Sequence, residues 1–189
     1  PGTLTIQKIE LTVTAYNRLK TYGEPNPGLN YDYSGFVNGD DASDIDVEPN
    51  IATDATELSD AGAYNIVVSG GSDNNYNFHY VWGTLNIAKA DLAALADDQS
   101  KEYGEENPEL TITYSGFVNG DDATDIETPP VSSTSADETS IPGTYAITLT
   151  AGTDNNYNIV NTDGTLTITK AVLSAVADNK EKSYSDSNP

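Results

Sequence analysis

Residues 34–45 read SGFVNGDDASDI, and residues 115–126 read SGFVNGDDATDI, so two stretches of twelve residues differ at a single position. The second stretch begins 81 residues after the first. The same spacing separates KTYGEPNP, which starts at Lys20, from KEYGEENP, which starts at Lys101. Self-similarity at a fixed period, without insertions, is typical of tandem structural units. The sequence therefore predicts one fold laid down twice.

The repeat also predicts the domain boundaries. Complete units are expected at residues 9–89 and 90–170. Residues 1–8 contain GTLTI, which matches the end of a unit, and residues 171–189 contain KSYSDSNP, which matches the beginning of a third one. We therefore expect a piece of a longer array that continues in both directions.

Apolar and polar residues alternate in several segments of each unit, as in half-buried β-strands. One strand is expected over residues 9–15 and another over residues 29–33. A meander is expected from residue 64 to residue 87, with turns rich in Gly and Asn. A short helix is expected between residues 39 and 45, where Asp residues can cap it. Because no long helical stripe occurs, the fold class is mostly β.

The connection between the units contains no Gly or Pro from Thr84 to Tyr103, so a flexible linker is not expected. The inward-facing positions change from odd numbers at Leu85 to even numbers at Leu92. This change of phase predicts a bulge or a change of sheet near Lys89. The two units should form an elongated, stiff pair.

Charge and composition exclude several functions. The chain has 30 acidic and 8 basic residues, which gives a net charge of −22. Such a surface repels nucleic acids and anionic membranes, and no apolar run approaches the length of a membrane span. The absence of Cys removes disulfides and thiolate sites, and it favours a bacterial surface protein over a secreted eukaryotic one.

The basic residues all lie at unit junctions or in the first strands of a unit. We expect Lys89 and Lys170 to lie against acidic loops of an adjacent unit and to orient the joint between units. The alternative is that these lysines are solvated and owe their spacing to duplication alone.

Six aspartates form a repeated cluster that offers oxygen ligands for Ca²⁺. They are Asp40, Asp41, Asp44, Asp121, Asp122 and Asp125. The cluster matches neither an EF-hand nor a nonapeptide calcium repeat, and Asx turns account for the same residues. Calcium is therefore one interpretation, and no cofactor is the other.

Catalytic chemistry is not expected. His79 is the only histidine, and a Val occupies its position in the second unit, so a Ser-His-Asp triad or a transition-metal site cannot be assembled. We interpret His79 as a residue on a strand surface and Trp82 as a shield for the domain junction. We expect Tyr22 and Tyr103 to pack on the core of their own unit with the hydroxyl at its edge.

The ordered motifs YGE with NP, YSGFVNGDDA, GTY, DNNYN and GTLTITKA resemble the bacterial MBG-type extracellular repeats that carry a YG motif. The resemblance implies two tandem β-grasp-like domains in a large surface protein or adhesin; an immunoglobulin-like β-sandwich is the alternative fold. It carries over no catalytic residue.

We therefore expect a non-enzymatic stalk of an adhesin, extracellular or on a bacterial cell surface, that projects a distal binding region. Neighbouring repeats of the same chain are the expected partners. A module that binds a glycan or a host protein is one alternative. A filament of chains that associate head to tail by strand exchange is the other.

Overall fold

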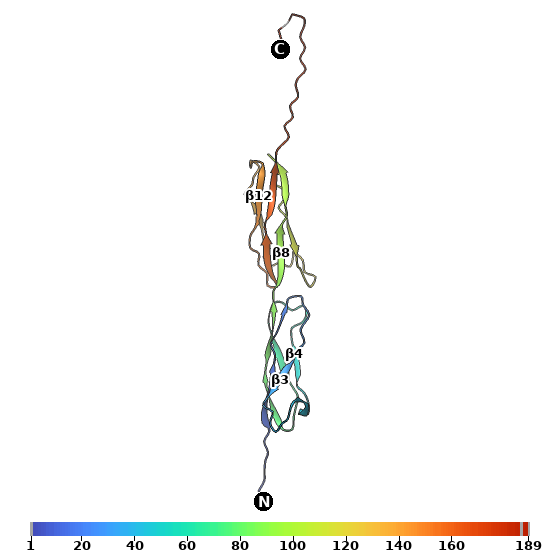
Figure 1. The fold of residues 1–189 in the computed structure, drawn as a ribbon, viewed down its shortest axis with the longest axis vertical. Helices are drawn as coiled ribbons and strands as arrows, with labels where there is room; N and C mark the ends of the chain where they lie inside the picture. Colours follow the sequence, from blue (N-terminus) through green and yellow to red (C-terminus); the bar gives the residue numbers. More distant parts are fainter. Residues whose placement is uncertain (1, 186, 189) are drawn as a thin grey trace.

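The computed structural model describes residues 2–185, 187 and 188. Two β-sheet units follow one another along the long axis of the molecule (Figure 1). Unit 1 runs from β1 to β7 and unit 2 from β8 to β14, and only Lys89 separates β7 from β8. Residues 2–8 and 171–185 contain no strand and extend from the two ends.

The elements recur in the same order in both units, except that the short 3-10 helix η1 is assigned only in unit 1. Unit 1 consists of β1 (Ile9–Ala15), β2 (Arg18–Thr21), β3 (Tyr31–Ser34), η1 (Ala42–Asp44), β4 (Asn50–Thr53), β5 (Gly62–Ser69), β6 (Tyr76–Val81) and β7 (Gly83–Ala88). Unit 2 consists of β8 (Ala90–Ala96), β9 (Gln99–Glu102), β10 (Ile112–Ser115), β11 (Ser132–Thr134), β12 (Gly143–Leu149), β13 (Tyr157–Thr162) and β14 (Gly164–Thr169).

Each unit contains two sheets. In unit 1 the strand orders are β3-β1-β6 and β2-β7-β5-β4, and in unit 2 they are β10-β8-β13 and β11-β12-β14-β9. Both sheets of unit 1 are mixed. In one sheet β1 pairs antiparallel with β3 and parallel with β6, and in the other β7 pairs antiparallel with β5 and parallel with β2. The parallel pairs set the units apart from the antiparallel sheets of the immunoglobulin-like alternative.

The inward rows of the two sheets form the core of each unit. In unit 1 the fully buried side chains are Leu11, Val13, Ile66, Val68 and Leu85, and their counterparts in unit 2 include Leu92, Ile147 and Leu166. Alternation along the strands places these side chains on one face and polar ones on the other. The mostly β fold in two tandem domains, predicted from the sequence, is confirmed.

The predicted meander is wrong in its middle strand. β5 and β7 pair in one sheet, but β6, which lies between them in the sequence, crosses to the other sheet and pairs with β1. The crossing back occurs at Gly83, where a side chain would lie 2.8 Å from the backbone oxygen of Tyr16. The predicted change of sheet near Lys89 is confirmed, because β7 and β8 belong to different sheets.

Candidate functional site

The turn that carries the Tyr-Gly pair is held by a buried lysine. Lys20 is buried in β2, and its Nζ donates to the carbonyl oxygens of Glu24, Thr56 and Glu57 at 2.9, 3.2 and 3.2 Å. Asn26 Nδ2 adds a hydrogen bond of 2.6 Å to the Ala55 carbonyl. These bonds join the turn to the loop after β4, so they fix the direction in which the turn points.

Unit 2 builds the same brace. Lys101 Nζ donates to the carbonyl oxygens of Glu105 and Asp137 at 2.9 and 2.7 Å, and Asn107 Nδ2 donates to the Ala136 carbonyl at 2.6 Å. The KxYGExNP motif therefore has a structural role in each unit, and this role is independent of the neighbouring unit.

Tyr22 leaves its own unit and inserts into the next one. Its side chain is only 7% exposed. Its hydroxyl donates to Asp121 Oδ2 at 3.0 Å, and its ring meets the Tyr157 ring edge-on at 5.6 Å between centroids. Asp121 Oδ2 also accepts a hydrogen bond of 2.7 Å from the Tyr157 hydroxyl. One carboxylate oxygen of unit 2 thus receives a tyrosine hydroxyl from each unit.

Gly23 brings the backbone of the turn against unit 2. Its φ of +84° lies in the left-handed region that glycine adopts without strain. A Cβ at this position would lie 2.5 Å from Cγ2 of Val118, which is closer than any two such atoms can approach. The absence of a side chain at Gly23 is therefore required for the turn to reach Val118.

A second set of hydrogen bonds lies beside the tyrosine. Asn156 Oδ1 accepts from the backbone N–H of Ala61 at 2.9 Å, and Asn156 Nδ2 donates to Asp60 Oδ1 at 2.9 Å. The oxygen and the nitrogen of the Asn156 amide thus both bond to the loop before β5. The Tyr22 contacts and the Asn156 contacts together prevent rotation about the single connecting residue.

The electrostatics of the joint keep the tyrosine hydroxyls protonated. Burial, together with the negative charge of Asp121, raises the pKa of Tyr22, although a hydrogen bond with Asn119 partly offsets the rise. Burial and the hydrogen bond to Asp121 also raise the pKa of Tyr157. Both hydroxyls therefore remain hydrogen-bond donors to Asp121 over the physiological pH range.

The two lysines predicted at the joints differ in their surroundings. Lys89 Nζ donates to the carbonyl oxygen of Asp154 at 2.7 Å, so it contacts the acidic loop of unit 2 through the backbone and not through a carboxylate. Lys170 follows β14 and borders an open hollow beside Tyr103 and Ile141.

The predicted calcium ligands of unit 1 serve local hydrogen bonds. Asp41 accepts from the Ser43 backbone N–H at 2.8 Å, and Asp44 accepts from the Asp41 backbone N–H at 2.8 Å. The two aspartates thereby form a capping box at the N-terminus of η1. Asp40 Oδ2 accepts from the Tyr76 hydroxyl at 2.7 Å. Hydrogen bonding by Ser43 lowers the pKa of Asp41.

The counterparts in unit 2 behave in the same way. Asp122 accepts from the Thr124 backbone N–H, Asp125 accepts from the Asp122 backbone N–H, and Asp121 receives the two tyrosine hydroxyls. Within the described part of the chain, no three acidic or histidine side chains are grouped so that they could hold a metal ion. The structure therefore does not bring either set of aspartates together as a ligand cluster.

Tyr103 does not pack on the core of its unit as expected, because its side chain is 47% exposed. Tyr22 is buried in an apolar cluster that continues from the core of unit 1 into unit 2, but its hydroxyl bonds to Asp121 of unit 2 and does not lie at the edge of its own unit. Trp82 is 58% exposed at the end of β6 and does not shield the junction. His79 is exposed on β6, as predicted.

Sequence reasoning missed the partners of the Tyr-Gly turn. Val118 and Asp121 lie in the repeated SGFVNGDDA stretch, and Asn156 lies in the repeated DNNYN stretch. The repetition marked both stretches, but it could not show that they meet the turn of the preceding unit.

The comparison with protein families finds the MBG domain (YGX type) twice in tandem, at residues 11–86 and 92–167. No curated protein matches the chain. Among the described residues, none forms a helix with the length and apolar character of a membrane span. Because the two matches together cover most of the sequence, the chain belongs to the MBG domain family of the YGX type.

Proposed function

We propose that the two units are spacer repeats in the stalk of a bacterial cell-surface or secreted adhesin, where they project a distal binding region. MBG domains are typically extracellular repeats, and the tandem pair is consistent with a protein built from such repeats. In this proposal the chain is not an enzyme, and its partners are neighbouring repeats of the same kind.

The joint between the units is the observation that carries the proposal. A spacer must transmit orientation from one repeat to the next, and a single connecting residue cannot do so alone, because its backbone can rotate. Two sets of contacts lie at separate points of the interface. Tyr22 and Gly23 of unit 1 contact Asp121 and Val118, and Asn156 of unit 2 contacts the loop before β5. An array joined in this way behaves as a rod whose repeats contact only their neighbours.

The distribution of charge supports the same role. From Thr21 to Ala88 the chain has 11 carboxylates and no Lys or Arg, and from Glu102 to Thr169 it has 12 carboxylates and no Lys or Arg. Surfaces of one sign repel one another laterally, so neighbouring stalks stay apart and soluble.

Small-angle X-ray scattering tests the proposal. The reference is a variant with six Gly and Ser residues inserted after Lys89, which lengthens the connection and makes it flexible. The distance distribution of the wild type should fit one elongated particle, and that of the insertion variant should require an ensemble of interunit angles. Equal distributions for the two proteins would contradict a spacer that holds its orientation.

A further inference from the structure

The first and the last segment of unit 1 lie side by side in a single register. β1 pairs in parallel with β6, and β2 pairs in parallel with β7. The paired residues are 67 positions apart along both pairs, although the two pairs belong to different sheets. At the crossing between the sheets, Asn17 Oδ1 accepts from the Thr84 backbone N–H at 2.8 Å. Residues 9–21 therefore pair with residues 76–88 without a shift of register.

Backbone hydrogen bonds extend this register past the ends of the strands. The N–H of Ile9 donates to the Asn75 carbonyl at 2.9 Å at the start of the paired segments. The N–H of Tyr22 donates to the Ala88 carbonyl at 2.8 Å at their end. The two segments are therefore bonded to each other from the first residue of the unit to its last strand.

Unit 2 repeats the arrangement. β8 pairs in parallel with β13, and β9 pairs in parallel with β14, again with partners 67 positions apart. At the crossing between the sheets, Asp98 Oδ1 accepts from the Thr165 backbone N–H at 2.7 Å. Asp98 takes the place of Asn17, so the side-chain oxygen at this point is present in both units although the residue type differs. The single register therefore belongs to the repeat and not to one unit.

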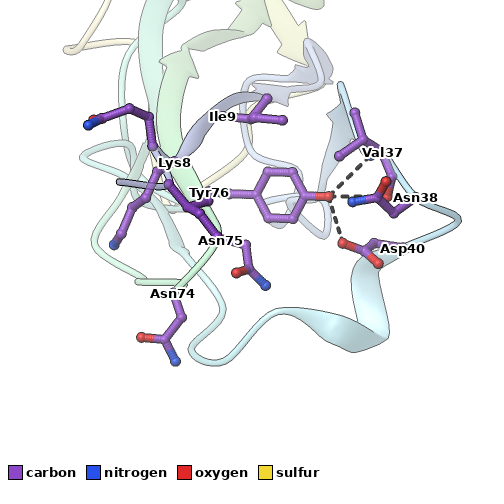
Figure 2. A pocket seen from close by; sticks show the side chains of 10 residues that line it. Lys8, Ile9, Val37, Asn38, Asp40, Asn74, Asn75 and Tyr76 are labelled. Atoms are coloured by element: carbon purple, nitrogen blue, oxygen red, sulfur yellow. Dashed lines mark hydrogen bonds between the residues drawn. The ribbon is translucent and has the colours of Figure 1, made fainter. Parts of the chain in front are cut away.

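A buried tyrosine fixes the start of the second segment. Tyr76 is the register partner of Ile9, and its hydroxyl donates to Asp40 Oδ2 at 2.7 Å (Figure 2). The same hydroxyl accepts from the Val37 backbone N–H at 3.1 Å. The equivalent tyrosine of unit 2 makes the same two kinds of bond. The start of β6 is therefore tied to the loop after β3 as well as to β1.

The chain enters and leaves a unit at opposite ends of the paired segments. It enters unit 1 at the start of residues 9–21 and leaves at the end of residues 76–88 (Figure 1). Because the pairing is parallel, tension along the chain pulls the two segments past each other along their length. The hydrogen bonds of the ladder run between the strands, across this direction, so they share the load and must break together. If both segments were pulled at the same end, the bonds would open one after another.

We propose that the paired segments form a shear clamp in each unit, which keeps the fold closed when the chain is stretched. The shear clamp consists of residues 9–21 with 76–88 in unit 1 and of residues 90–102 with 157–169 in unit 2. It gives each repeat the function of bearing load, which is separate from the orientation that the joint provides. Its use in a stalk rests on the proposed function, whereas its resistance to force lies within a single unit.

Optical tweezers with two attachment geometries test the shear clamp. The chain has no Cys, so Thr3→Cys with Val172→Cys attaches the handles in exposed, strand-free segments on either side of the two units. Gln7→Cys with Asn74→Cys, both at exposed positions, attaches them at the same end of the clamp of unit 1. We expect one unfolding event for each unit in the first geometry. Each event should require several times the force needed in the second geometry at the same pulling speed.

Two matched valines separate the clamp from overall stability. Val13 in β1 and Val68 in β5 are both fully buried, so Val13→Ala and Val68→Ala remove the same volume from the core. Urea unfolding should show a loss of stability for both variants. Val13→Ala should lower the force of one of the two events in the first geometry, with unit 2 of the same molecule as the reference. Val68→Ala should leave both forces nearly unchanged, because β5 stays in place while the clamp opens.

Two results would overturn the proposal. One is an equal unfolding force in the two geometries, and the other is an equal loss of force with the two valine variants. Neither result would alter the interunit orientation that small-angle scattering measures. A flexible connection between the units would in turn leave both events at high force, so the clamp and the proposed spacer role fail separately.

Discussion

Tyr22 and Tyr103 occupy the same position in the same motif, yet one is 7% exposed and the other 47%. The lysine that braces each turn is buried in both units, and the glycine after each tyrosine has a similar positive φ. The units therefore differ in what lies beyond the turn and not in the turn itself. The Tyr-Gly turn is therefore formed within its own unit, and the following unit binds it in that conformation.

The largest expected effect is the loss of stability when the bracing lysine is removed, and this loss should be similar in the two units. Lys20→Met and Lys101→Met each keep most of the side-chain volume but remove the buried ammonium group that donates to the loop carbonyl oxygens. Each substitution should lower the free energy of unfolding of its own unit by about 2–4 kcal/mol. Native-state hydrogen exchange measures this, because the amides of each unit report on that unit.

Lys180→Met is the matched control, since Lys180 is exposed in the strand-free segment after unit 2, where its ammonium lies 3.8 Å from the Asp178 carboxylate. It should change neither unit. A loss confined to the Lys20 variant would contradict an equal role for the two lysines, because it would show that the Lys20 bonds stabilise the joint and not the unit.

The glycines separate the turn from the joint. Gly23→Ala and Gly104→Ala both place a side chain at positive φ, which costs about 1 kcal/mol. Gly23→Ala should cost more, because its Cβ meets Val118, whereas Gly104→Ala meets open space. Thermal unfolding should show the larger loss for Gly23→Ala, and equal losses would contradict a close contact at Val118.

A smaller effect concerns acid pH. Asp73 accepts the backbone N–H groups of Asn75 and Tyr76, and the Asn75 bond is the main reason why the pKa of Asp73 is lowered, against the opposing effect of burial. A lowered pKa in the folded state stabilises the fold above the unfolded pKa of about 4 and ceases to do so as the pH falls through the folded pKa.

Asp73→Asn should therefore lower the stability of unit 1 at pH 7, and the difference from the wild type should shrink as the pH falls below about 4. Urea unfolding at a series of pH values measures the difference. Asp54→Asn, at an exposed position, is the control and should show no such trend. A difference that stays constant with pH would show that the ionised carboxylate has no part in the effect.

The smallest expected effect concerns calcium. Because Asp41, Asp44 and their counterparts accept hydrogen bonds within their own turns, we expect the melting temperature to change by less than about 1 °C between excess Ca²⁺ and EDTA. Differential scanning calorimetry measures this. A rise of several degrees with Ca²⁺ would show that the acidic loops bind the ion.

The sequence could predict those parts of the fold that depend on local pattern. The alternation of apolar and polar residues identified β1, β5, β6 and β7, and the fixed period of the sequence repeat identified the two tandem units. The sheet to which β6 belongs could not be predicted, because alternation identifies a strand but not its neighbours.

The joint was beyond prediction for a related reason. Tyr22 and Tyr103 have nearly the same neighbours in sequence, so no local pattern distinguishes the buried ring from the exposed one. The contact of Tyr22 with Asp121 and that of Gly23 with Val118 join residues almost one hundred positions apart in the chain. Only the direction of the turn, set by Lys20, brings them together.

A distance measurement between spin labels tests the central claim that Tyr22 fixes the orientation of the two units. The chain has no Cys, so Asn65→Cys and Ala146→Cys place one label at the same exposed position of each unit. Double electron–electron resonance should give one narrow distance distribution in the wild-type background and with Tyr103→Ala, and a broad one with Tyr22→Ala. A broad distribution in the wild-type background, or a narrow one that Tyr22→Ala leaves unchanged, would contradict the account.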